Sequence, residues 1–136
     1  MSISDDEILE AVLDIVHARL STVVEAEQVV KTLRNAIGEG SGVAAYELAM
    51  FVCPGFMAGT DEVRQYFLQF SGECEDLFKT AFPMLLRNAE EGRVHAMSRL
   101  SVYYQTGIPP VTIDHNVMRE WDDRIAKELA KDRKNP

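Results

Sequence analysis

The chain has 136 residues and a mass of 15.3 kDa, a size that suits one domain and leaves little room for a second. Apolar residues make up 46% and charged residues 26%, a mixture that excludes wholesale disorder. The formal net charge of −8 argues against nucleic acid and anionic membranes as partners, because binding to either needs a positive field.

The N-terminus and the cysteines predict a cytoplasmic protein. Asp5, Asp6 and Glu7 stand where a signal peptide would carry positive charge. The sequence contains no run of about 18 apolar residues, so we expect no membrane span. Cys53 and Cys74 are too few for a disulfide framework and fit a reducing compartment, so we expect them to stand alone.

Helical periodicity extends along most of the chain. In the first segment Ile8, Val12 and Val16 recur on one face, behind a capping box formed by Ser4 and Glu7. No segment alternates apolar and polar residues as a strand does. The pattern predicts an all-α fold of about seven helices, over residues 4–20, 23–38, 42–53, 60–71, 73–91, 93–106 and 114–131.

Glycine and proline mark the expected ends of these helices. Gly40 and Gly92 supply positions where a positive φ is tolerated. Gly72 is expected to end the fourth helix just before the fifth begins. Pro83 lies inside the fifth and predicts a kink, because proline lacks the amide donor of a helical residue.

The chain also contains an internal repeat. Five positions recur at a constant offset of 52: Gly40, Ala44, Leu48, Val52 and Gly55 match Gly92, Ala96, Leu100, Tyr104 and Gly107. The tetrapeptide 33–36 recurs as 86–89, at an offset of 53. Small residues such as Ala44 and Ala96 let neighbouring helices pack closely, so we expect two related helical hairpins that stack on each other.

The second copy resembles the Sel-one-like repeat, a relative of the tetratricopeptide repeat. The residues that carry the likeness are Ala89, Gly92, Ala96, Leu100, Tyr104, Gly107, Asp114 and Trp121. The first copy departs from the family pattern, since Ile37 replaces the first alanine, Val52 replaces the tyrosine and no tryptophan follows. The resemblance implies a right-handed stack of antiparallel helical hairpins (a short α-solenoid), and a role in adaptor or regulatory binding.

We therefore expect one helical-repeat domain over residues 1–136. Its predicted parts are N-terminal helices (1–32), a degenerate repeat (33–71), a better-matched repeat (73–131) and a short tail (132–136).

No constellation of catalytic or metal-binding residues emerges, and we expect no catalytic residue, metal or cofactor. His17, His95 and His115 are far apart in the sequence, whereas a zinc site needs several close ligands. The glycine-rich segment 38–42 lacks a nearby lysine and joins two helices, so it predicts a tight turn rather than a phosphate loop. Acid clusters, among them Asp122 and Asp123, are expected on solvated faces.

The sequence therefore favours a non-enzymatic protein that binds another protein. The predicted contact residues lie on the short first helices of the two hairpins: Tyr46, Glu47, Met50, Arg99 and Tyr103. Aromatic side chains flanked by charge are common at binding hot spots, although a core position for Tyr46 and Tyr103 is the competing interpretation.

The specific hypothesis is an acidic immunity protein, monomeric or weakly dimeric, that neutralises a basic, nuclease-type bacterial toxin. The resemblance suggests the role, and the charge of −8 would speed capture of a basic partner. The alternatives are a general adaptor, a small hydrolase using Asp122, Asp123 and His115, and a subunit of a larger assembly. The last would use an apolar patch formed by Met50, Phe51, Phe56 and Met57.

Overall fold

The computed structural model describes residues 3–17, 22–54 and 59–134, and every regular element within these ranges is helical. The prediction of an all-α protein is thereby confirmed. The elements are α1 (Asp5–Val16), α2 (Val23–Gly38), α3 (Gly42–Val52), α4 (Asp61–Leu68), the 3₁₀ turn η1 (Ser71–Glu73), α5 (Cys74–Glu90), α6 (Val94–Thr106) and α7 (His115–Lys134).

Side-chain oxygens cap the start of most helices. Ser4 forms the predicted capping box with Glu7, and Thr22 forms a second box with Glu25 at the start of α2. The Asp114 carboxylate accepts from the amides of residues 116 and 117 at the start of α7. Because such caps satisfy amides that have no helical partner, these local signals set the helix starts.

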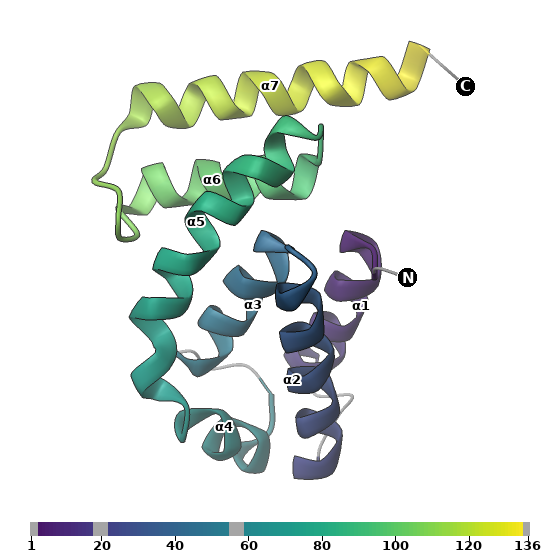
Figure 1. Cartoon of the computed structure of the whole chain (residues 1–136), viewed down its shortest axis with the longest axis vertical. Coiled ribbons are helices and arrows are strands. Elements are labelled where there is room, and N and C mark those ends of the chain that lie inside the picture. The colour runs from purple at the N-terminus through teal and green to yellow at the C-terminus, as the bar shows by residue number, and fades with distance from the viewer. Residues whose placement is uncertain (1–2, 18–21, 55–58, 135–136) are drawn as a thin grey trace.

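The segment from residue 60 to 91 differs from the prediction. The expected helix over 60–71 already ends at Leu68. Gly72 lies inside η1, the 3₁₀ turn that separates α4 from α5. The fifth helix continues through Pro83, and its ribbon changes direction along its length (Figure 1). Proline leaves one helical carbonyl without its usual donor and crowds the preceding turn, which accounts for the bend.

The third helix forms the centre of the molecule. It packs against α2 and α5, and it makes smaller contacts with α1, α4 and α6 (Figure 1). All of its residues except Met50 are buried. A helix that is apolar on nearly every side needs neighbours all round, and α3 has them. Further along the chain, α6 packs against both α5 and α7.

The turn before α3 recurs, bond for bond, before α6. In the first turn Glu39 N donates to Asn35 O and Ala36 O, Gly40 N to Ile37 O, and Ser41 N to Ala36 O. In the second, Glu91 N donates to Arg87 O and Asn88 O, Gly92 N to Ala89 O, and Arg93 N to Asn88 O. All four bonds recur at an offset of 52, and both glycines have positive φ, 98° at Gly40 and 84° at Gly92.

The repeated tetrapeptide is out of register with this repeated turn. Its offset of 53 would equate Asn35 with Asn88, but the bonding pattern equates Ala36 with Asn88. The burial agrees with the offset of 52: Asn35 is exposed, whereas Ala36 and Asn88 are both buried. The match of four letters therefore does not mark equivalent positions in space.

Candidate functional site

Four of the five predicted contact residues form one cluster between α3 and α6, which we call the α3–α6 junction: Tyr46, Glu47, Arg99 and Tyr103. The Arg99 guanidinium donates to Glu47 Oε1 from Nη2 at 2.7 Å and from Nε at 3.2 Å. Their side chains are only 18% and 11% exposed. Glu47 and Arg99 also lie 52 residues apart, so they occupy equivalent places in the two copies of the repeat.

Two tyrosines complete the α3–α6 junction. The ring centroids of Tyr46 and Tyr103 lie 6.0 Å apart, and the Arg99 guanidinium carbon lies 5.8 Å from the Tyr46 centroid. The Tyr103 hydroxyl donates to the carbonyl oxygen of Phe78 in α5. Burial raises the pKa of both phenols, and the nearby Glu47 carboxylate adds to the rise at Tyr46. Both phenols are therefore neutral hydrogen-bonding groups at neutral pH.

Burial limits what this cluster can offer to a partner. Tyr46 and Glu47 are each 8% exposed and Tyr103 is 0% exposed. Both tyrosines therefore lie in the core, which was the competing interpretation. Met50 and Arg99 are half-buried and are the members of the predicted set with surface to present. The binding role of the set stays a prediction, whereas its contacts show that it joins α3 to α6.

A second group, which the sequence analysis did not single out, fixes α5 against the start of α3. The buried Asn88 side chain accepts from Gly42 N at 2.8 Å and donates to Gly40 O at 3.1 Å. A Cβ placed on Gly42 would lie 2.5 Å from the backbone nitrogen of Leu85. The glycine-rich segment 38–42 therefore lies at a close helix crossing, and because Gly42 and Asn88 are 46 residues apart, no local sequence pattern pairs them.

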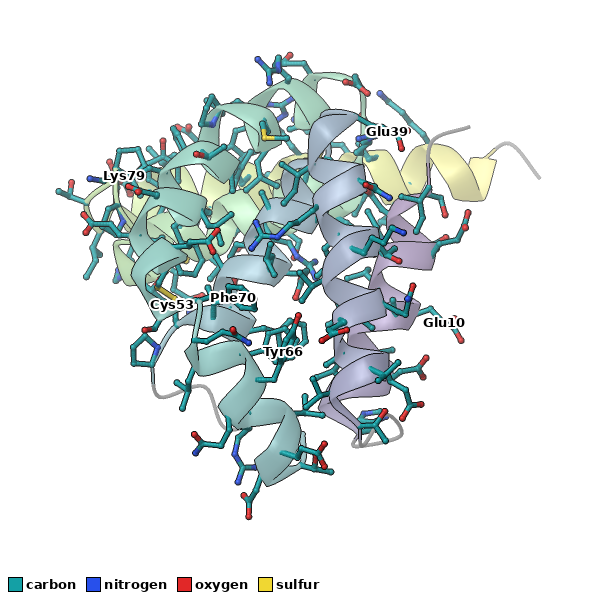
Figure 2. The ribbon with its side chains drawn as sticks, turned by 60° about the horizontal axis from the view of Figure 1, so that its bottom comes forward. Glu10, Glu39, Cys53, Tyr66, Phe70 and Lys79 are labelled. Carbon is teal, nitrogen blue, oxygen red and sulfur yellow. A yellow bond between two sulfur atoms is a disulfide. The ribbon has the colours of Figure 1, made fainter. Side chains whose placement is uncertain are left out.

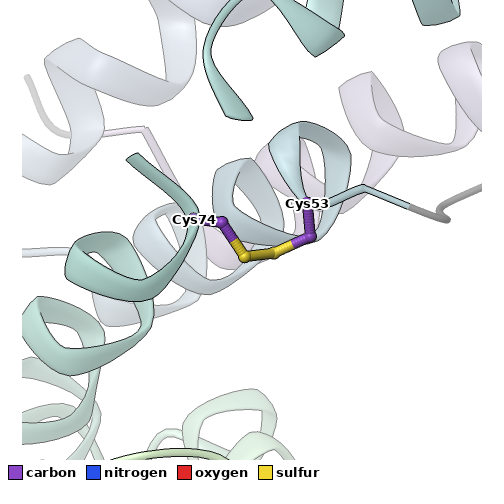
Figure 3. Close-up of a disulfide and its surroundings, with 2 residues drawn as sticks. All are labelled: Cys53 and Cys74. Atoms are coloured by element: carbon purple, nitrogen blue, oxygen red, sulfur yellow. A yellow bond between two sulfur atoms is a disulfide. The ribbon is translucent and has the colours of Figure 1, made fainter. Parts of the chain in front are cut away.

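The two cysteines form a disulfide, contrary to the expectation that they stand alone. Cys53 ends α3 and Cys74 begins α5, and their Cα atoms lie 5.0 Å apart (Figure 3). Since α3 and α5 pack against each other, residues that are 21 apart in the sequence meet at one end of this helix pair. The disulfide removes the cysteine-based argument for a reducing compartment, and the cytoplasmic location remains a prediction.

The outer faces of α1 and α2 carry much of the negative charge. Residues 1–60 contain nine acids and three bases, a net charge of −6 of the total −8. Glu10 on α1 and Glu39, which directly follows α2, are both exposed, and both side chains lie at the surface in Figure 2. Two apolar side chains on the same helices are also exposed, Leu13 at 44% and Val24 at 67%.

An aromatic group lies where α4 meets α2. The rings of Tyr66 and Phe70 are 5.4 Å apart and edge-on (Figure 2). The Arg34 guanidinium from α2 lies 5.6 Å from the Phe70 centroid and forms two hydrogen bonds with the Glu73 carboxylate at 3.2 Å. On the inner side of α4, Phe67 stacks on Phe51 of α3, with centroids 5.0 Å apart.

The residues of the competing hypotheses that the structure describes lie on two helices: the proposed hydrolase residues Asp122, Asp123 and His115 on α7, and Met50 and Phe51 of the apolar patch on α3. His95 Nε2 lies 3.2 Å from Asp6 Oδ1 of α1, and Asp122 accepts from the Ser101 hydroxyl at 2.7 Å. Of the proposed apolar patch, Phe51 is buried and Met50 half-buried, while Phe56 and Met57 lie outside the described residues, as does Gly55 of the repeat. No three described histidine, cysteine, aspartate or glutamate side chains are grouped closely enough to hold a metal ion.

A scan of family models, a search of curated proteins and a search of solved structures each found no match. Within the described ranges, no helix combines the length and apolar character needed to cross a membrane.

Proposed function

We propose that the chain is a non-enzymatic protein-binding module built as a short stack of helical hairpins. The observation that carries the proposal is the repeated turn: four hydrogen bonds before α3 recur before α6 at an offset of 52. The helix contacts support it: α2 packs on α3, α3 on α5, α5 on α6 and α6 on α7, with α4 outside this series. Arrays of this kind bury one face against the next unit and present the other faces to partners.

The most specific form of the proposal is an acidic immunity protein for a basic toxin domain. Complementary charge raises the rate at which two proteins meet, and the acidic faces of α1 and α2 give a basic partner a place to approach. A general adaptor is the alternative, since it would share the fold and the charge but would not abolish the activity of its partner.

The test uses the product of the neighbouring reading frame in the genome as the binding partner. We expect a stable complex by isothermal titration calorimetry and, for an immunity protein, suppression of that product's toxicity on co-expression. Binding without suppression would favour the adaptor. An absence of binding to the neighbouring product would contradict the immunity assignment.

Matched charge variants test which surface is used. The double variant Glu10→Lys/Glu39→Lys and the control Glu120→Lys/Asp123→Lys on α7 change the net charge equally, from −8 to −4, at exposed positions. If the partner approaches α1 and α2, the first variant should slow association about tenfold and the control much less. Equal effects from both variants would argue against an α1–α2 contact surface.

A further inference from the structure

The disulfide encloses the α4 segment. Between Cys53 at the end of α3 and Cys74 at the start of α5, the chain leaves the helix pair, forms α4 and η1, and returns. Both cysteines are half-buried rather than enclosed in the core, so each residue is partly exposed to solvent. The bond therefore links the end of α3 directly to the start of α5 (Figure 3).

The α3–α5 pair does not depend on this bond alone. At its opposite end Asn88 bonds to Gly40 and Gly42, and the α5 backbone at Leu85 passes against Gly42. Buried residues along both helices join the same core, among them Leu48 and Ala81. Opening the disulfide would therefore leave α3 and α5 packed and would change mainly the segment that it encloses.

The contacts that hold α4 in place are fewer than those between α3 and α5. Only Val63 and Phe67 of its eight residues are buried, and Phe67 stacks on Phe51. The link from η1 to α2, between Arg34 and Glu73, has side chains 41% and 43% exposed, and exposed ion pairs stabilise a fold only weakly. An eight-residue helix is also too short to persist in water without its contacts.

We propose that the Cys53–Cys74 disulfide is a thiol-operated clasp on α4: a dithiol reductant opens it, α4 undocks, and the rest of the helix stack stays folded. In the reaction, a thiolate of the reductant attacks one sulfur of the disulfide and forms a mixed disulfide, while the other sulfur leaves and takes up a proton. The second thiol of the reductant resolves the mixed disulfide. The cystine gains two electrons to become two thiols, and the reductant becomes a disulfide. Undocking uncovers Phe51 and Phe67.

The experiment is hydrogen–deuterium exchange with mass spectrometry on the full chain, with and without dithiothreitol. Alkylation with iodoacetamide counts the thiols in each sample. We expect no alkylated cysteine before reduction and two after it. On reduction the amides of α4 should exchange about 30- to 800-fold faster, the range that loss of a cross-link typically implies, while those of α6 keep their rates.

The double variant Cys53→Ala/Cys74→Ala is the matched control. It should exchange like the reduced wild-type chain, and dithiothreitol should not change it. Three results would overturn the proposal: two reactive thiols in the chain oxidised with glutathione disulfide, α4 rates that do not respond to reduction, or α6 rates that rise as much as those of α4. The wild-type comparison decides the matter even if the variant does not fold.

Discussion

Asn88 holds two parts of the molecule together with one amide group. Its oxygen and nitrogen satisfy Gly42 N and Gly40 O, both at the turn before α3, and the residue itself is 3% exposed. Buried polar groups that lose their partners are costly, so the position admits few substitutes. Asn35, the residue at the same place in the repeated tetrapeptide, is exposed and has no such constraint.

This contrast gives a matched pair of variants. Asn88→Ala should lower the free energy of unfolding by about 2–3 kcal/mol, because it leaves the buried amide of Gly42 and the partly buried carbonyl of Gly40 without this partner. Asn35→Ala should change it by less than about 0.5 kcal/mol, as an exposed position does. Urea denaturation measures both. Similar losses from the two variants would mean that the buried amide group is not what holds the turn.

Gly42 offers a second matched pair. Gly42→Ala places a methyl group 2.5 Å from the Leu85 backbone nitrogen, and backbone cannot move aside as a flexible side chain can. We expect a loss of about 1–3 kcal/mol in the free energy of unfolding. Gly38→Ala, with nothing within 4 Å of the new Cβ, should be neutral or stabilising by up to about 1 kcal/mol. A harmless Gly42→Ala would show that α3 and α5 are further apart.

At the scale of elements, the α3–α6 junction connects equivalent helices of the two copies. Arg99 is the part of this junction that carries formal positive charge, and it meets both the Glu47 carboxylate and the Tyr46 ring. Arg34 makes the same two kinds of contact, with Glu73 and Phe70, at an exposed place. The two arginines therefore differ mainly in burial, which makes one a control for the other.

Arg99→Met should lower the free energy of unfolding by about 2–4 kcal/mol, because it leaves the Glu47 carboxylate buried without its partner. Adding Glu47→Leu should restore part of that loss, since the unpaired charge is then gone. Arg34→Met should lower the free energy of unfolding by at most about 1 kcal/mol. Chemical denaturation of the three variants and the wild-type chain checks this, and equal losses at Arg99 and Arg34 would contradict the role given to burial.

The phenol of Tyr103 should affect how the free energy of unfolding changes at alkaline pH. Its pKa is raised above the ordinary value of 10.0, first by burial, so the unfolded chain loses this proton at a lower pH than the folded chain does. The stabilisation is complete below pH 10 and is lost as the pH rises above that value, by up to about 1.4 kcal/mol per pH unit for one proton. In urea denaturation between pH 9 and 11.5, Tyr103→Phe should show a shallower fall than the wild-type chain. An unchanged slope would contradict the assignment.

At the scale of the whole molecule, local signals predicted more than long-range ones. Apolar spacing placed the helices over 23–38, 42–53 and 93–106 within one residue of α2, α3 and α6, because it reflects one face of one helix. The meeting of Cys53 with Cys74, the burial of Glu47 and the early end of α4 depend on which helices pack together. No local pattern encodes that choice, and the tetrapeptide at offset 53 pointed to the wrong register.

We propose that two equivalent hairpin turns, 52 residues apart, build a stack joined at the α3–α6 junction. A solution NMR structure of the oxidised full chain tests it most directly. We expect residues 35–52 to superpose on 87–104 with the four turn hydrogen bonds in matching places, and the Glu47 and Arg99 side chains to be in contact. Segments that match only at an offset of 53, or an α3 that does not touch α6, would contradict it.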